Sequence, residues 1–250
     1  MRYFPYTSGV RSVALITITL LFPSFLLAVN KNPVPVARWS QDAPNCTLRQ
    51  DYEDGRTYYG ISISDFEIIL AVDRQELEKI HHRATAMLSV LLTFRYKGGG
   101  QLEVQQNRFS LEFVKHLQLM KTSLDPDVML HHLQENVDDI TDEVERHQLR
   151  KHPENKAQKE AELQARLKDY TEMMDFISTQ GLRPAVLNHS NPAITGWVFF
   201  SIKDRWIGPW RKPEQFILRV PVHNLMVEFP FFLPPHTGAV ELRRRPEPQP

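Results

Sequence analysis

Hydrophobic positions along the chain follow two different periods, and the change between them divides the sequence. Before residue 125 and after residue 180, apolar residues mostly alternate with polar ones, as in a half-buried β-strand. Between these limits they recur at steps of three and four, as on one face of a helix. The pattern therefore predicts β-structure interrupted by a helical segment over 125–180.

The helical segment has start and stop signals of its own. Asp125 precedes Pro126, the usual order of an N-cap and a proline at the first helical position. Gly181 and Pro184 predict the end, and His152-Pro153 breaks the pattern in the middle. Two seams joined by a short break predict a long antiparallel, coiled-coil-like helical hairpin, with arms of about 24 residues and about 35 Å. The seams are Leu130, Leu133, Val137, Ile140 and Val144, then Leu163, Leu167, Tyr170, Met174 and Ile177.

The alternating stretches predict strands on both sides of the hairpin. Lys97-Gly98-Gly99-Gly100 predicts a hairpin turn and not a phosphate-binding loop, because no helix follows it. Asp73 and Glu76 predict a capped short helix over 74–83. Strands that are not separated by single helices predict an α+β fold, an antiparallel immunoglobulin-like β-sandwich interrupted by the helical hairpin. The predicted strands are 58–72 with a β-bulge at Ser64-Asp65, 86–96, its partner from 102, 109–113, 197–202, 216–222 and 225–231.

The N-terminus predicts export. Arg2 and Arg11 form a positive region, and residues 12–29 carry no charged side chain, so a signal peptide ending at Ala28 is expected. The alternative is an uncleaved membrane anchor, since the uncharged stretch just reaches the length of a span. Pro23 lowers its apolarity and favours cleavage. Either way the protein is expected to be periplasmic or extracellular. It would be attached to the membrane only if this N-terminal segment remains uncleaved.

These patterns together predict the domain organisation. The domains are a signal peptide over 1–28, an extended linker or arm over 29–57, the β-sandwich over 58–124 and 181–235, the hairpin over 125–180, and a disordered Pro/Arg-rich tail over 236–250.

A resemblance adds to this prediction. The signal sequence, the strands rich in Phe and Val, and the late strand Gly196-Trp197-Val198-Phe199-Phe200 resemble immunoglobulin-like accessory modules of exported bacterial proteins. The resemblance covers the β portion and not the hairpin. It implies a binding or assembly domain and no catalytic residue.

Composition excludes several kinds of site. Cys46 is the only cysteine, which excludes an intramolecular disulfide, a thiolate zinc cluster and a CxxC redox site. A formal net charge of zero argues against a nucleic-acid binder. No catalytic or cofactor-binding motif occurs, so no cofactor is expected. His131 and Glu135 have the spacing of two metal ligands on a helix but would need a third from elsewhere. The adjacent pairs His81-His82 and His131-His132 form no site of their own, because neighbouring residues on a helix point about 100° apart.

Charge separates the helical segment from the rest of the chain. Residues 125–180 hold 14 acidic and 7 basic side chains, whereas residues 29–124 and 181–250 hold 16 acidic and 21 basic ones. One interpretation is a solvated helix face whose acids suit the helix dipole. The other is an acidic surface that meets a basic partner or the basic remainder of the protein. The acids are Glu135, Asp138, Asp139, Asp142, Glu143 and Glu145.

A second candidate site lies between two late strands. Glycine and proline make residues 206–213 a loop, and Trp206 and Trp210 stand there beside Arg205, Arg211 and Lys212. The tryptophans either plug the end of the sandwich or form a binding loop with adjacent positive charge.

We therefore expect an exported, non-enzymatic interaction or assembly module, acting through the acidic hairpin and the aromatic-basic loop. Its partner would be another, unidentified protein, or a second copy joined through the hairpin. One alternative is a periplasmic chaperone-like protein, which would leave an apolar seam of the hairpin exposed to clients. A second is a metal-dependent hydrolase in which His131 and Glu135 converge with other ligands.

Overall fold

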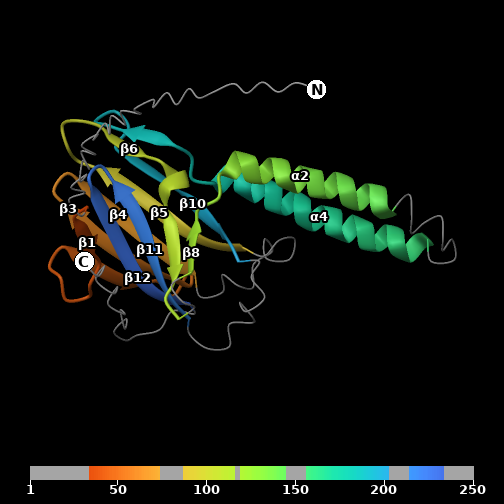
Figure 1. The fold of residues 1–250 in the computed structure, drawn as a ribbon, viewed down its shortest axis with the longest axis horizontal. Helices are drawn as coiled ribbons and strands as arrows, with labels where there is room; N and C mark the ends of the chain where they lie inside the picture. The colour runs from red at the N-terminus through yellow and green to blue at the C-terminus, as the bar shows by residue number, and fades with distance from the viewer. Residues whose placement is uncertain (1–33, 74–86, 116–118, 145–155, 203–213, 234–250) are drawn as a thin grey trace, which may run out of the picture. The chain divides into compact units, whose positions relative to one another are not determined.

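Strands make up 48% of the residues that the structure describes, and helices 29%. The computed structural model describes residues 34–73, 87–115, 119–144, 156–202 and 214–233 (Figure 1). All of them belong to one unit of the chain, which begins at Val34. The predicted signal peptide, the short helix over 74–83, the aromatic-basic loop and the C-terminal tail lie outside these residues.

Two five-stranded sheets contain most of the strands. Sheet 1 has the order β1-β12-β11-β7-β8, in which β1 runs parallel to β12 and the other neighbours are antiparallel. Its strands are β1 (Val36–Arg38), β7 (Ser110–Phe113), β8 (Leu119–Thr122), β11 (Glu214–Val222) and β12 (Leu225–Leu233).

Sheet 2 has the order β10-β5-β4-β3-β2 and is antiparallel throughout. A third, two-stranded sheet pairs β6 with β9. The strands of these two sheets are β2 (Cys46–Gln50), β3 (Arg56–Ile63), β4 (Phe66–Asp73), β5 (Met87–Tyr96), β6 (Leu102–Val104), β9 (Ala185–Leu187) and β10 (Ala193–Ser201).

Sheets 1 and 2 bury a common core. Alternate residues of each strand point to the same face, so every second apolar position of β11 and β12 meets those of β4, β5 and β10. Rings join the strands within this core: Phe216 stacks on Phe231 with centroids 5.3 Å apart, and Phe94 lies 5.9 Å from Phe109. Burial of these large side chains is the main source of stability.

Two helices lie side by side next to sheet 2 (Figure 1). Helix α2 (Pro126–Glu143) begins where predicted, because the Asp125 carboxylate accepts hydrogen bonds from the backbone N–H groups of Asp127 (2.9 Å) and Val128 (3.3 Å). Helix α4 (Lys156–Gln180) ends just before Gly181, as predicted. A second cluster of buried residues joins both helices to β5 and β10; it comprises Met87, Met129, Leu133, Tyr170, Met173, Ile177, Trp197 and Phe199.

The start of α2 and the end of α4 are both held by strand β10. Leu124 N–H donates to the Phe199 carbonyl and Leu182 N–H donates to the Trp197 carbonyl, each at 2.8 Å. Gly181 permits the close approach of the two helices, since a Cβ there would lie 3.2 Å from Pro126 and 2.6 Å from the Ile177 carbonyl oxygen. The helix ends are therefore fixed to carbonyls two residues apart on one strand.

The predicted fold class is wrong. The β-structure is distributed over several sheets, one with a parallel pair, and is not an antiparallel immunoglobulin-like sandwich. No long antiparallel hairpin of equal arms is shown: the structure has two separate helices, of 18 and 25 residues, and residues 145–155 between them lie outside the described ranges. The broader description as an α+β protein rich in β-structure fits the described chain.

Two strand predictions also need correction. The predicted bulge at Ser64-Asp65 is a two-residue turn between β3 and β4, and Ser64 has the positive φ of 38° that such a tight turn requires. Strand β6 pairs with β9 and not with β5, so 97–100 joins two sheets. Residues 29–57, expected as an extended arm, contain β1 and β2. The strands expected at 86–96, 109–113, 197–202, 216–222 and 225–231 are confirmed.

Candidate functional site

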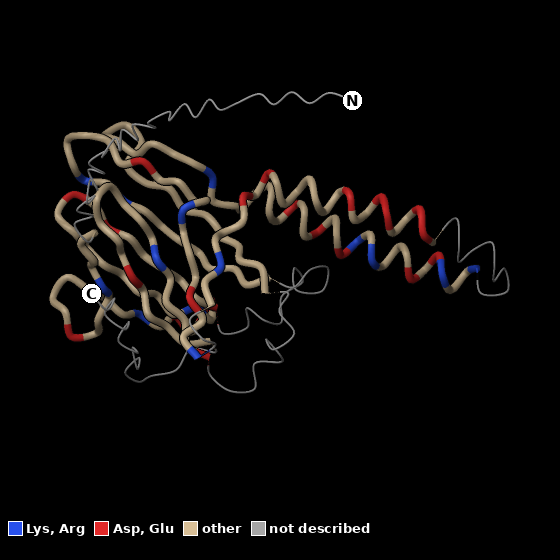
Figure 2. The backbone as a smooth tube through the Cα atoms, in the orientation of Figure 1, with Lys and Arg blue, Asp and Glu red and all other residues tan. Residues whose placement is uncertain are grey.

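Helix α2 presents acidic side chains to solvent. Five of the predicted acids lie on it, all exposed, and the helix contains no Lys or Arg (Figure 2). The two carboxylate oxygens of Glu135 lie 3.4 Å from His131 Nε2 and 3.1 Å from His132 Nδ1. The five acids are Glu135, Asp138, Asp139, Asp142 and Glu143.

Helix α4 differs, because three of its five acids are paired with lysines of the same helix. Lys159 lies 2.8 Å from Glu162, and Lys156–Glu160 and Lys168–Glu172 are each 3.7 Å apart. Hydrogen bonds from Lys159 and Gln158 lower the pKa of Glu162. In the described chain none of Glu135, Asp138, Asp139 or Glu143 forms an ion pair with Lys or Arg. The acidic bias of the helical segment is therefore concentrated on α2.

The helix dipole does not explain this placement. Negative charge is stabilised at the N-terminal end of a helix, and the only acid in the first turn of α2 is Asp127. Asp127 is in turn paired with Arg183, outside the helix. The five exposed acids all lie in the second half of α2, where the dipole gives them no support. Of the interpretation that the acids form a solvated helix face suited to the dipole, the solvent exposure is confirmed and the contribution of the dipole is not.

A groove of about 760 Å³ runs beside the acidic face. Helix α2 forms one wall, and the start of β5 and the end of β10 contribute Met87 and Ser201. Its apolar lining lies near the start of α2, together with the N-cap carboxylate of Asp125, and its other charged side chains lie further along the helix. The described lining residues are Met87, Leu124, Asp125, Val128, Met129, His132, Leu133, Glu135, Asn136, Asp138, Asp139 and Ser201.

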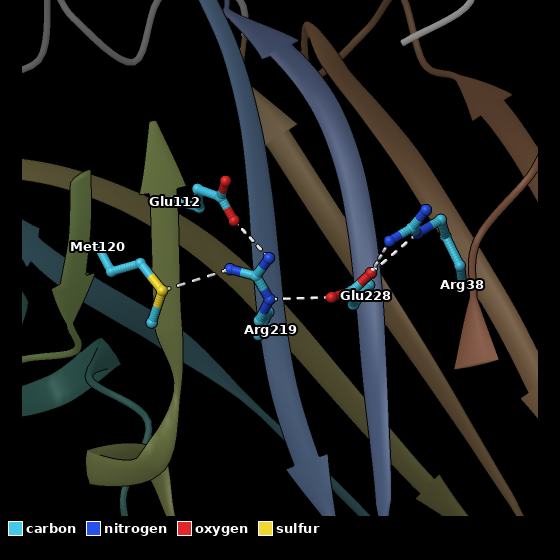
Figure 3. Close-up of polar contacts among 5 residues, drawn as sticks. All are labelled: Arg38, Glu112, Met120, Arg219 and Glu228. Carbon is cyan, nitrogen blue, oxygen red and sulfur yellow. Dashed lines mark hydrogen bonds and ion pairs between the residues drawn. The ribbon is translucent and has the colours of Figure 1, made fainter. Parts of the chain in front are cut away.

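A charged network on sheet 1 is the other polar cluster of note. Glu112, Arg219 and Glu228 each stand between two core residues of their strands, so strand alternation places all three on the outer face. Arg219 forms ion pairs with Glu112 and, at 2.9 Å, with Glu228, which also accepts from Arg38 Nε at 2.8 Å (Figure 3). Two arginines balance two glutamates, and Arg219 and both glutamates are nearly buried. This network joins four strands and leaves no net charge, which indicates a structural role.

The network makes the stability of the fold dependent on pH. Burial alone would raise the pKa of Glu228, but hydrogen bonds and charge from Arg38 and Arg219 outweigh it and lower that pKa below its usual 4.5. Because the folded pKa is below the unfolded one, ionised Glu228 stabilises the fold above pH 4.5, and this contribution disappears as the pH falls through the folded pKa.

Urea unfolding at neutral and acidic pH tests this expectation. The Glu228→Gln protein should start with lower stability at neutral pH and lose less of it on acidification than the wild type does. Parallel stability curves for the two proteins would show that Glu228 contributes nothing to the acid sensitivity.

The structure describes only part of the predicted site residues. The five acids of α2 lie together on one helix, three of them beside the groove. Trp206, Trp210, Arg205, Arg211 and Lys212 lie outside the described residues, as do Glu145, His81 and His82, so their role stays a prediction. In the described ranges no group of three or more His, Cys, Asp or Glu side chains could hold a metal ion.

Two features of the site were missed from the sequence, and each has a signal. Val128, His132, Glu135 and Asp139 recur at steps of four, three and four, which marks a second face of α2 beside the buried seam. The charged network could have been inferred from single charges inside apolar strands, which commonly pair across strands.

The fold and the groove together define an α+β protein with an acidic helix beside an apolar-lined groove. No helix in the described part of the chain has the length and apolarity needed to span a membrane. No family model, curated protein or solved structure matches the chain.

Proposed function

We propose that this protein is an exported, non-catalytic interaction module that binds a basic protein partner through helix α2. The observation that carries the proposal is the contrast between two neighbouring helices: three of the five acids of α4 pair with lysines of the same helix, whereas α2 exposes five acids and has no Lys or Arg of its own. Export rests on the predicted signal peptide over 1–28, and the aromatic-basic loop is a second proposed contact.

Complementary charge suits such a role. An exposed surface of one sign speeds encounter with a partner of the opposite sign and fixes its orientation, and both effects weaken with salt. Exposed acids contribute little to stability, so a group of five on a helix that has no Lys or Arg has no evident folding role. Binding to a basic surface would account for the exposed acids on α2.

The chaperone alternative has less support. A client-binding helix pair would leave an apolar seam exposed, but both seams of α2 and α4 are buried or half-buried in the described residues. Val128, 56% exposed, belongs to neither seam and is a single apolar position beside the groove. A lone apolar side chain suits a specific contact better than a broad client surface.

The hydrolase alternative requires ligands that converge on one point. His131 and His132 both contact Glu135, yet all three side chains are exposed on a single helix. The described chain brings no further ligand to them. This geometry favours an interaction surface over a metal centre.

Neutralising the acids of α2 should strongly weaken partner binding. The change is Glu135→Gln, Asp138→Asn, Asp139→Asn, Asp142→Asn and Glu143→Gln in the full chain. If each lost pair contributes a few tenths of a kcal/mol or more, the partner captured by crosslinking in the native envelope should fall at least about tenfold.

The chain offers a control of equal charge change on α4. Glu160→Gln, Glu162→Gln, Asp169→Asn, Glu172→Gln and Asp175→Asn also remove five negative charges. This variant should keep the partner. Equal loss in both variants would mean that only net charge matters, and retention in both would show that α2 is not the binding surface.

A further inference from the structure

The groove beside α2 is mostly apolar at one end, where the Asp125 carboxylate accepts hydrogen bonds from the helix N-terminus and from Gln106, and acidic at the other. Near the start of the helix, the exposed Val128 and the buried Met87 and Met129 line the groove together. Further along, Glu135 and Asp139 line the groove and are exposed. Methionine side chains adapt to the shape of what they contact, so the part of the groove lined by Met87 and Met129 can accept an apolar group from a ligand.

The spacing along α2 determines how a ligand would have to be built. Val128 and Asp139 are eleven positions apart, which is about 16 Å along a helix. The lining residues Val128, His132, Glu135 and Asp139 recur at steps of four, three and four. This is the spacing with which one helix packs along another.

We infer that this groove binds an amphipathic α-helix of the partner protein, with an apolar anchor at one end and Lys or Arg about three turns away. The inference rests on the proposed function and names the chemistry of its partner. The apolar anchor fills the groove over Met87 and Met129, and the basic end lies against Glu135, Asp138 and Asp139. A groove of 760 Å³ is of the size that buries a few large side chains, while the rest of the helix lies on the surface.

Charge complementarity distinguishes this occupant from others. An apolar helix without basic residues would desolvate the carboxylates of Glu135, Asp138 and Asp139 without supplying a cation to pair with them, which is unfavourable. A purely basic segment would make the charge contacts but no apolar contact with Val128, Met87 and Met129. Only a segment with both features in the right order satisfies both ends.

The inference can be tested with a synthetic probe and the purified full chain. The probe is a fluorescent, helix-forming 15-residue peptide with two leucines one turn apart at one end and two lysines eleven positions further on. A scrambled peptide of the same composition is the reference. By fluorescence anisotropy the ordered peptide should bind at least about tenfold more tightly than the scrambled one, and added salt should weaken it.

Variants of the protein separate the two ends of the groove. Val128→Ser should reduce binding of the ordered peptide several-fold at any salt concentration, and Asp139→Asn should reduce it mainly at low salt. Val186→Ser is the matched control, because Val186 is also exposed (47%) but lies on β9, away from the groove. Equal binding of the two peptides, or no effect of Val128→Ser, would overturn the inference.

Two other occupants would also overturn it, and each has a signature. If residues 203–213 of the same chain fill the groove, the wild type should not bind the peptide and the Trp206→Ser, Trp210→Ser variant should. If a second copy fills it, sedimentation should show a dimer that Val128→Ser dissociates. The proposed function is tested separately: partner capture that depends on the α2 acids while the peptide fails to bind would leave the function standing and remove only this inference.

Discussion

Replacing Arg219 with methionine should destabilise the fold by about 3 kcal/mol, the largest loss we expect from a single substitution outside the core. Arg219 is the cation between Glu112 and Glu228, and the three side chains are 14%, 9% and 6% exposed. Methionine keeps the length of the side chain but leaves Glu112 without its cation and Glu228 with Arg38 alone. An unpaired charge in a nearly buried position is costly, so the midpoint of urea unfolding should fall sharply.

An exposed ion pair elsewhere in the sheets provides the control. Arg95 and Glu67 lie 3.3 Å apart on β5 and β4, and the Arg95 side chain is 55% exposed. Arg95→Met should cost under about 1 kcal/mol, because water solvates the remaining carboxylate.

A triple variant tests the mechanism of the loss. Glu112→Leu, Arg219→Met and Glu228→Leu together also remove the two carboxylates that lose their partner in Arg219→Met. This variant should recover most of the stability. An equal loss in Arg219→Met and Arg95→Met would show that the network contributes no more than a surface ion pair.

The second large effect is expected at Gly196 on β10. A Cβ at this position would lie 2.6 Å from Leu182 Cα and 2.7 Å from Leu182 N, and both are backbone atoms that cannot rotate away. Gly196→Ala therefore has to push the end of α4 off the strand and weaken the hydrogen bond from Leu182 N–H to the Trp197 carbonyl. We expect a loss of about 2–3 kcal/mol in urea unfolding.

Gly99→Ala is the matched control for this substitution. A Cβ at Gly99 would have no neighbouring atom within 4 Å, so alanine meets open space. Alanine also restricts the unfolded chain, which makes this variant neutral or slightly more stable. If Gly196→Ala proves as stable as Gly99→Ala, the strand and the helix end are not in tight contact.

Local signals in the sequence predicted the local structure well. Asp125-Pro126 and Gly181 mark the ends of the helical region because capping and backbone geometry depend on neighbouring residues. The seams were partly correct: Leu133, Leu163, Tyr170 and Ile177 are buried, whereas Met129 and Met173 are buried and were not expected to be. A helix that packs on a sheet as well as on another helix needs a wider apolar face than one seam.

Pairing between distant segments could not be predicted in the same way. Strand β6 pairs with β9, which lies beyond both helices, and β1 pairs in parallel with β12 near the other end of the chain. Alternation shows that a segment is a strand with one buried face, but it does not specify the neighbour. The fold class depended on those neighbours and was wrong for that reason.

In the candidate site, too, features of a single segment could be predicted and contacts between distant segments could not. The acids of α2 could be identified from composition and helical spacing, because both are properties of one segment. The groove could not, since Met87 and Ser201 reach it from strands that are far from α2 in the chain. Likewise, single charges inside apolar strands indicate that charged pairs form across strands, but which residues pair depends on the register that sets Arg219 opposite Glu228.

The attachment of the helices to one strand has a consequence for how this protein can be altered. Leu124 precedes α2 and Leu182 follows α4. The backbone N–H groups of both residues donate hydrogen bonds to carbonyls of β10 that are only two residues apart. The turns nearest these points pack on Met87, Trp197 and Phe199, and beyond them the described parts of the helices pack on each other. Whole turns could therefore be added to or removed from the distal ends of both helices without a change in the sheets. The two helices can therefore vary in length and in surface residues while their attachment to β10 stays the same.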